Sequence, residues 1–183
     1  MRLAAGQLAP DFSVTDIHGR SVQLRDLRGK KVLLAFLRNT ACPFCNLRVH
    51  ELNRHYPALQ ANGLEIVVFF ESTAETIRRS TFLKEQMLTI VADPPKEVYR
   101  SYGVEASLWK MTLTHLSGQA RQELKEAKAL GFEPTLEKGT TASLIPAEFL
   151  VDELGAISQA YYGDRMNDHI PVPVIEQFLK VNA

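Results

Sequence analysis

The alternation of apolar runs with amphipathic stretches predicts strands that alternate with helices along this chain. Residues 32–37 form a continuous apolar run, and residues 64–70 form another that only Glu65 interrupts. Runs of this length favour strands covered on both faces over helices. A shorter run at residues 88–92 predicts a third strand. Because strands separated by helices form parallel units of one sheet, we expect the first two strands to be adjacent and parallel.

An amphipathic helix is predicted directly after the first of these strands. Its apolar positions are separated by steps of four, three, four and three: Cys45, Val49, Leu52, Tyr56 and Leu59. Pro43 suits the first helical position, where its missing N–H is not needed, so Cys42 becomes the residue that caps the helix. Pro57 lies in the helix interior, and we expect it to kink the helix or to end its regular part.

The remaining patterns complete an α/β fold with a central mixed sheet flanked by helices. Alternating segments predict an N-terminal hairpin at 12–15 and 21–24, and a second antiparallel hairpin at 148–151 and 157–162. Helices are predicted from Ser72 or Thr73 to about residue 86, and at 96–102 and 173–181. Residues 107–130 are rich in helix formers, with a bend near Gly118, and belong to a helical insertion at about 107–141. We expect one domain over residues 1–183.

The charge and the length of apolar runs argue against several classes of function. The 183 residues carry 21 basic and 21 acidic side chains, so the formal net charge is zero, and no basic stripe is present. This argues against nucleic acid or an anionic membrane surface as a partner. No apolar stretch approaches the ~20 residues that cross a bilayer, and the first residues lack a signal-peptide core. We therefore expect a cytoplasmic protein with no membrane partner.

The two cysteines of the chain carry the candidate chemistry. Cys42 and Cys45 form a C-x-x-C motif at the start of a helix that follows a buried strand. The free N–H groups and the positive end of the helix dipole favour a thiolate at Cys42, and we expect Arg38 and Arg48 to add positive charge. Cys45 lies on the apolar stripe, where burial raises the pKa of a thiol. We predict a redox-active dithiol in which Cys42, open to solvent, attacks first.

These residues have alternative interpretations. Both cysteines could be ordinary small residues of the core. A zinc site needs about four nitrogen or sulfur ligands, so with only two cysteines His50 and His55 would have to contribute from around the helix. Arg38 could be a strand-end residue that faces solvent, and Thr40 could simply form the turn. We favour the dithiol, and we expect neither a metal nor a cofactor.

Five stretches of the chain are similar to sequences of a known family: GQLAPDF, LRDLRGKKVLLAF, FLRNTACPFCNL, IVADPPKEVYRSYGV and PAEFLVDELGAISQAYYG. They resemble the peroxiredoxin (AhpC/TSA) family of the thioredoxin superfamily. The branch that carries C-P-x-C-N after F-x-R resembles this chain most closely, and the likeness spans nearly all of it outside 107–141. The resemblance implies a thioredoxin-like, peroxiredoxin-like fold and a thiol-dependent oxidoreductase.

The resemblance offers two ways to assign the cysteines. In the P-x-x-x-T-x-x-C motif of peroxiredoxins, this chain has Arg38, Cys42 and Cys45 at the Pro, Thr and nucleophile positions. That register implies attack by Cys45, but the arginine that those enzymes place before the later strand has no counterpart here. Thioredoxins imply attack by Cys42, and Pro146 falls where they keep a cis-proline, so we predict a cis Ile145–Pro146 bond. The helix geometry leads us to favour Cys42.

Three functions are consistent with the sequence. The first is reduction of hydroperoxides through a sulfenic acid that the second cysteine traps as a disulfide, and the family resemblance favours it. The second is reduction of protein disulfides through a mixed disulfide. The third is a non-catalytic interaction module that binds through 107–141. For the enzymes we expect a thioredoxin- or glutathione-type reductant, a homodimer as one oligomeric state, and five residues that support the cysteines: Arg38, Thr40, Pro43, Arg48 and Pro146.

Overall fold

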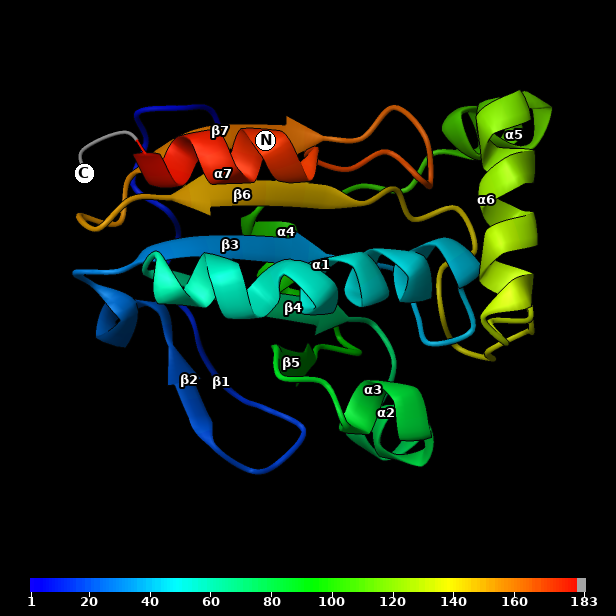
Figure 1. Ribbon diagram of the computed structural model, residues 1–183, viewed down its shortest axis with the longest axis horizontal. Helices are drawn as coiled ribbons and strands as arrows, with labels where there is room; N and C mark the ends of the chain where they lie inside the picture. Colours follow the sequence, from blue (N-terminus) through cyan, green and yellow to red (C-terminus); the bar gives the residue numbers. More distant parts are fainter. Residues whose placement is uncertain (181–183) are drawn as a thin grey trace.

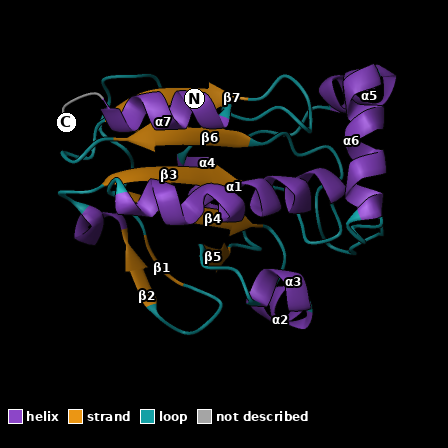
Figure 2. Ribbon diagram, viewed as in Figure 1, coloured by secondary structure: helices purple, strands orange, loops and turns teal. Residues whose placement is uncertain are grey.

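The computed structural model describes residues 1–180, which are arranged around a five-stranded mixed sheet in the order β5-β4-β3-β6-β7 (Figures 1 and 2). β3 (Lys31–Phe36) lies between its parallel neighbour β4 (Leu64–Phe70) and its antiparallel neighbour β6 (Ala147–Val151). β5 (Thr89–Ala92) and β7 (Ile157–Tyr162) form the two edges. The predicted fold class and the parallel pairing of the two long strands are confirmed.

Helices cover both faces of this sheet. α1 (Pro43–Ala61) and α7 (Val172–Lys180) lie on one face, and α4 (Glu97–Ser101) lies on the other (Figure 1). Because side chains alternate along a strand, the two faces form separate apolar layers. Leu33 belongs to the layer with α1 and α7, whereas Phe36 belongs to the layer with α4.

The remaining elements are short. They are β1 (Ser13–Thr15), β2 (Ser21–Gln23), the 3-10 helix η1 (Leu24–Leu27), α2 (Ala74–Arg79), α3 (Thr81–Lys84), α5 (Leu108–Leu116) and α6 (Gly118–Ala129). β1 and β2 pair antiparallel, which confirms the N-terminal hairpin. β6 and β7 pair antiparallel, which confirms the second hairpin.

Some helix boundaries differ from those predicted. Pro57 does not end α1, which continues to Ala61. The helix predicted up to residue 86 is divided into α2 and α3, because Ser80 has an extended backbone and its hydroxyl accepts a hydrogen bond from the Leu83 amide (3.2 Å) as the cap of α3. Of the closing helix, the predicted residue Val181 lies outside the described residues.

The Ile145–Pro146 peptide bond is trans, so the predicted cis bond is wrong. The trans form is preferred even before proline, and a position ahead of a strand does not by itself reverse that preference. Pro146 is buried at the start of β6, and its carbonyl accepts a hydrogen bond from the Gly163 amide (3.0 Å).

The insertion at residues 107–141 is helical, as predicted. α5 and α6 stand at the end of the sheet where α1 begins, and α6 packs against α1 (Figure 1). Ser117 has an extended backbone between them, and its hydroxyl accepts a hydrogen bond from the Ala120 amide (3.4 Å), which produces the bend predicted near Gly118. Residues 107–141 are all described, and they contain no strand.

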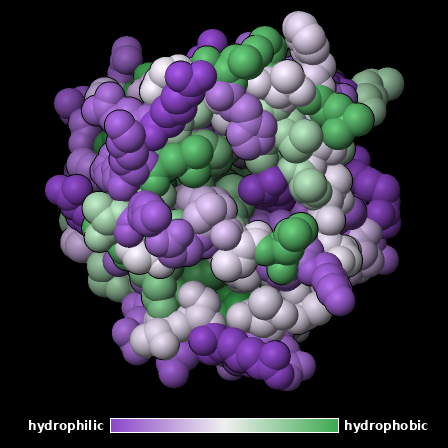
Figure 3. Space-filling view, turned by 90° about the vertical axis from the view of Figure 1, so that its right-hand side faces the viewer, coloured by the Kyte–Doolittle hydropathy of each residue, from purple (hydrophilic) through white to green (hydrophobic). Residues whose placement is uncertain are grey.

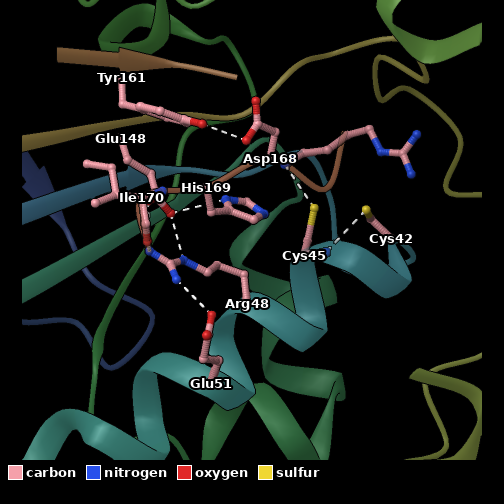
Figure 4. A network of polar contacts seen from close by, with 10 residues as sticks. Cys42, Cys45, Arg48, Glu51, Glu148, Tyr161, Asp168, His169 and Ile170 are labelled. Atoms are coloured by element: carbon pink, nitrogen blue, oxygen red, sulfur yellow. Dashed lines mark hydrogen bonds and ion pairs between the residues drawn. The ribbon is translucent and has the colours of Figure 1, made fainter. Parts of the chain in front are cut away.

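A buried ion pair joins α1 to β6. The Arg48 guanidinium donates two hydrogen bonds of 2.8 Å to the two carboxylate oxygens of Glu148, and both side chains are almost fully buried. The Ile170 amide donates to Glu148 (2.8 Å), the His169 ring nitrogen Nδ1 lies 3.1 Å from the same carboxylate, and Arg48 also donates to the Ile170 carbonyl (2.8 Å; Figure 4). The expectation that Arg48 adds positive charge beside the thiolate is therefore wrong, because Glu148 and Glu51 hold its guanidinium.

We expect Glu148→Gln to lower the free energy of unfolding by about 3–5 kcal/mol at pH 7, because the buried Arg48 charge would then have only the half-exposed Glu51 as its counter-charge. Urea unfolding followed by circular dichroism measures the change. Glu51→Gln is the matched control, since Glu51 is a half-exposed partner of the same arginine, and it should cost less than about 1 kcal/mol. Equal losses in the two variants would contradict this assignment.

The contribution of Glu148 to the free energy of unfolding should also depend on pH. Burial raises the pKa of its carboxyl, but the charges of Arg48 and His169 outweigh burial and lower the pKa to about 2. The folded state thus binds this proton less tightly than the unfolded state, so the stabilisation is complete above the unfolded pKa of about 4.3 and is lost as the pH falls towards 2. The stability difference between the wild-type protein and Glu148→Gln should therefore shrink over that range.

Candidate active site

The end of β3 and the start of α1 bring the two cysteines together. Cys42 has an extended backbone and caps α1, while Pro43 occupies the first turn, as predicted. The Cys45 amide donates to the Cys42 sulfur at 3.4 Å, so a free N–H group of the first helical turn is directed at this sulfur. Both cysteines are free thiols. The local sequence therefore builds a helix-capping thiol.

The surroundings shift the pKa values of the two thiols in opposite directions. Burial raises the pKa of the Cys42 thiol, but the hydrogen bond from the Cys45 side chain and the charge of Arg38 outweigh burial and lower the pKa to about 6. Burial, the hydrogen bond to Cys42 and the negative charge of Cys42 raise the pKa of Cys45 well above its ordinary value. Near neutral pH, Cys42 is thus the thiolate and Cys45 the thiol that donates to it.

Arg38 is the cation that acts on this pair. It follows β3, its backbone amide donates to the Cys45 sulfur (3.4 Å), its side chain donates to the Ala142 carbonyl, and its charge lowers the pKa of the Cys42 thiol. Arg38 is half-buried, so its side chain is partly accessible to solvent while its charge acts on both thiols. The positive charge that Cys42 receives comes from Arg38 and not from Arg48.

Cys42 is only 1% exposed, so the expectation that it is open to solvent is wrong. The loop of residues 133–142 after α6, here named the covering loop, bonds to the residues that precede Cys42. The Thr135 amide donates to the Ala41 carbonyl (3.4 Å), and the Asn39 side chain donates to the Thr140 hydroxyl (2.7 Å). Figure 3 looks onto this end of the molecule, where apolar groups lie among polar ones.

A carboxylate of the covering loop lies next to the cysteine turn. Glu137 Oε2 accepts hydrogen bonds from the hydroxyl of Thr40 (2.8 Å) and from the hydroxyl of Ser72 (2.9 Å). Ser72 is fully buried and its hydroxyl also accepts from the Thr40 amide (3.0 Å). Thr40 therefore does more than form the turn, because its hydroxyl also binds Glu137.

A second carboxylate holds the far end of the covering loop. Glu71 is buried at the end of β4, accepts a hydrogen bond from the Thr141 amide (2.8 Å), and forms an ion pair with Lys96 (3.4 Å). Burial raises the pKa of the Glu71 carboxyl, against the opposing hydrogen bonds of Thr141 and the charge of Lys96. The Glu71 amide donates to the Arg38 carbonyl (2.9 Å), which connects this carboxylate to the thiol site.

Four of the expected supporting residues lie at or near the start of α1. They have two different roles, one at the cysteine turn and one in the buried ion pair. Arg38, Thr40 and Pro43 lie at the turn around Cys42, whereas Arg48 serves the buried ion pair. Pro146 marks the start of β6, and the trans bond removes the geometric basis of the thioredoxin comparison there. Sequence reasoning did not identify the roles of four residues: Glu71, Ser72, Glu137 and Glu148. Only Glu148 has a clear sequence signal, as a charge inside the apolar strand AEFLV.

A cavity of about 490 Å³ lies between α1, α6 and the segment that precedes α7. Phe44, Glu123 and His169 are among its lining residues, but neither cysteine is. The helix-capping thiolate, rather than this cavity, marks the candidate active site, because the thiols carry the redox chemistry.

Two other features bear on the function of residues 1–180: clusters of metal-binding side chains and membrane-spanning helices. Within these residues, no group of three or more histidine, cysteine or carboxylate side chains could hold a metal ion. None of the helices described is long and apolar enough to cross a membrane.

Comparison with known proteins agrees with this site. The dithiol at the start of α1 and the five-stranded sheet define a thiol oxidoreductase with a thioredoxin-like fold. A family model, that of the AhpC/TSA family, matches residues 5–160. The chain therefore belongs to the AhpC/TSA family.

Individual relatives include both thiol-disulfide oxidoreductases and peroxiredoxins. Thiol-disulfide oxidoreductase ResA of Bacillus thuringiensis subsp. konkukian (strain 97-27) is 31% identical over 126 residues, which cover 68% of this chain and 71% of ResA. MT2597 of Mycobacterium tuberculosis (strain CDC 1551 / Oshkosh), named as a candidate peroxiredoxin, is 26% identical over 171 residues, 92% of this chain and 91% of its own. The crystal structure of peroxidoxin BcpB from Mycobacterium tuberculosis shares the fold, with a TM-score of 0.71 at 13% identity over 100% of this chain and 99% of that chain.

We expect iodoacetamide to modify Cys42 before Cys45 at pH 7, with a rate that rises with pH through a midpoint near 6. Arg38→Met should raise the midpoint by about one unit or more, because loss of the neighbouring positive charge disfavours the thiolate. Timed quenching and peptide mapping by mass spectrometry measure both rates. Arg54→Met, at an exposed position of α1, is the control and should leave the midpoint unchanged. Modification of Cys45 first would contradict this assignment.

Proposed function

We propose that this protein reduces disulfides by thiol–disulfide exchange, with Cys42 as the attacking thiolate and Cys45 as the resolving thiol. The observation that carries the proposal is the opposite shift of the two thiol pKa values, to about 6 at Cys42 and well above the ordinary value at Cys45. An attacking thiol works best as a thiolate near ambient pH, and a resolving thiol must stay protonated until the mixed disulfide has formed.

Two exchange steps account for the electrons and protons. The Cys42 thiolate attacks one sulfur of the substrate disulfide, and the S–S bond breaks as the other sulfur leaves as a thiolate. The Cys45 thiol then loses its proton to the departed thiolate and attacks the Cys42 sulfur, which releases the second substrate sulfur. The substrate gains two electrons, and the protein ends with a Cys42–Cys45 disulfide.

The second step is favoured by the first. Part of the rise in the pKa of Cys45 comes from its hydrogen bond to Cys42 and from the negative charge there. Both disappear when Cys42 enters a mixed disulfide, so the pKa of Cys45 falls at the stage when its thiolate is needed. The Arg38 amide, 3.4 Å from the Cys45 sulfur, can then donate to the new thiolate.

Hydroperoxide reduction is the second candidate, and the position of Arg38 beside the Cys42 sulfur supports it. Here the Cys42 thiolate attacks the terminal peroxide oxygen, the O–O bond breaks, and the departing alkoxide takes a proton from solvent water to become the alcohol. Cys42 becomes a sulfenic acid, which Cys45 converts to the same disulfide with release of water. Family relatives named as peroxiredoxins agree with this candidate.

Either reaction needs a reductant that returns two electrons to the Cys42–Cys45 disulfide. A thiol of the thioredoxin or glutathione type supplies this chemistry, and no metal or cofactor takes part in the steps above. A cytoplasmic location belongs to the same proposal, since a cytoplasmic thiol pool would keep Cys42 and Cys45 reduced. The proposal also includes a homodimer.

We expect Cys45→Ser to accumulate a mixed disulfide between Cys42 and a protein disulfide substrate, because the resolving thiol is missing. Cys42→Ser should reduce neither disulfide nor hydroperoxide above the uncatalysed rate. Mass spectrometry of the trapped adduct and initial rates with insulin, hydrogen peroxide and cumene hydroperoxide measure these outcomes, with thioredoxin or glutathione as the reductant.

The substrate comparison separates the candidates. Faster turnover of the protein disulfide supports exchange, and faster turnover of the peroxides supports the second candidate. If the free-thiol count does not change between oxidising and reducing buffers, both enzymatic proposals fail and a non-catalytic module is favoured. Conversion of peroxide by Cys42→Ser but not by Cys45→Ser would assign the attack to Cys45.

A further inference from the structure

Two hydroxyl groups near Cys42 converge on a single carboxylate oxygen. Thr40 Oγ1 and Ser72 Oγ both donate to Glu137 Oε2, at 2.8 and 2.9 Å. The Ser72 hydroxyl is oriented by the Thr40 amide, which donates to it at 3.0 Å, and Ser72 is fully buried. The two donors therefore have fixed directions, and an ionised oxygen at their meeting point receives two charge-assisted hydrogen bonds.

The donors and the acceptor belong to different parts of the fold. Thr40 lies two residues before Cys42, and Ser72 follows β4, so both donors sit on the sheet and its connecting turns. Glu137 instead comes from the covering loop, which the helical insertion carries. The scaffold thus provides an oxygen-binding site, and a separable segment of the same chain fills it.

The turn before Cys42 also carries a positive charge. Arg38 is close enough to Cys42 to lower its thiol pKa, and its Nε is buried with no hydrogen-bond partner within the described residues. A buried donor without a partner is costly unless another group reaches it. The turn before Cys42 therefore holds a cation and an unused donor in addition to the two hydroxyls.

Access to Cys42 requires this arrangement to open. The sulfur that is to attack belongs to a residue only 1% exposed, and the covering loop bonds to Asn39, Thr40 and Ala41 immediately before it. A substrate can contact the thiolate only after the structure around Cys42 has opened, and the covering loop, which is bonded to the turn before Cys42, is the segment that we take to move. Movement of the loop removes Glu137 from the two hydroxyls and leaves them without an acceptor.

We propose that Thr40 and Ser72 form a carboxylate subsite beside Cys42, which Glu137 fills when the covering loop is closed and a carboxylate of the substrate fills when it is open. The proposal rests on the proposed function, because it takes Cys42 as the residue that reacts. An incoming carboxylate restores the two hydrogen bonds that Glu137 gives up, so it offsets the cost of opening. A neutral carbonyl group can accept from the same hydroxyls, but its hydrogen bonds lack the charge assistance and are weaker.

The ligand class is thus a carboxylate-bearing molecule whose reactive sulfur or oxygen reaches Cys42. Two sources share this chemistry: a disulfide formed by an acidic thiol, and a hydroperoxide of a carboxylic acid.

The first test uses two alkylating probes that differ only in charge and carboxylate, iodoacetate and iodoacetamide. In the wild-type protein both should modify Cys42 slowly. In Glu137→Ala the iodoacetamide rate should rise because the loop opens. The iodoacetate rate should rise further, so that the iodoacetate-to-iodoacetamide ratio increases by about tenfold, the value of one charge-assisted hydrogen bond.

Matched variants separate the subsite from simple opening and from general charge. Glu137→Ala/Ser72→Ala has the same charge as Glu137→Ala but lacks one donor, and its ratio should return towards the wild-type value. Glu133→Ala removes an exposed charge from the same loop and should leave the ratio unchanged. If Glu137→Ala does not fold, Glu137→Gln gives the same comparison with a smaller increase. A ratio that stays constant in Glu137→Ala, or stays high in the double variant, overturns the subsite.

The second test uses substrates with the wild-type protein. Dithiodipropionate is compared with its diamide, and linoleate hydroperoxide with its methyl ester. A lower KM for the acid than for its neutral counterpart, lost in Ser72→Ala, supports the subsite and shows which source is used; equal KM values within both pairs overturn it. Failure of the proposed function is distinguishable, since it appears as labelling of Cys45 first or as absence of turnover with all four substrates.

Discussion

The hydrogen bond from the Cys45 amide to the Cys42 sulfur depends on Cys42 being the residue that caps α1. That position exists because an apolar strand ends before Arg38 and because Pro43 begins the next helix without a free N–H of its own. Helix N–H groups, the Cys45 thiol and the Arg38 guanidinium then all favour charge on one sulfur. This offsets the burial that would otherwise keep Cys42 protonated. The chemistry of the site thus follows from how one strand passes into one helix.

A segment far along the chain borders the same site. The covering loop follows α6 and forms hydrogen bonds with the three residues that precede Cys42. Glu137 and Glu71 hold this loop through side-chain contacts with Ser72, Thr40, Thr141 and Lys96. A thiolate that is stabilised and yet buried is protected from adventitious oxidation, because oxidation of a thiol follows both its ionisation and its exposure.

The Arg48–Glu148 pair has a separate role. It joins α1 to β6 through Glu148 and to the segment before α7 through the Ile170 carbonyl. This ion pair fixes the helix that carries the cysteines against the sheet without contributing charge to the thiols. Arg38 and Arg48 are both near the C-x-x-C motif in sequence. Arg38 lowers the pKa of the Cys42 thiol, whereas Arg48 holds α1 against the sheet.

The sequence by itself determined the sheet, the helix that the cysteines open and the direction of the two thiol pKa shifts. These follow from local patterns: apolar runs at 32–37 and 64–70, the steps from Cys45 to Leu59, and Pro43 after Cys42. Only the tertiary structure decided the burial of Cys42 and the partners of Arg48, Thr40 and Glu137. These partners lie roughly a hundred positions apart, as Thr40 and Glu137 or Arg48 and Glu148 do. Hydrophobic periodicity carries no information about such pairs, because it reports which face of an element is buried and not which distant side chain covers it.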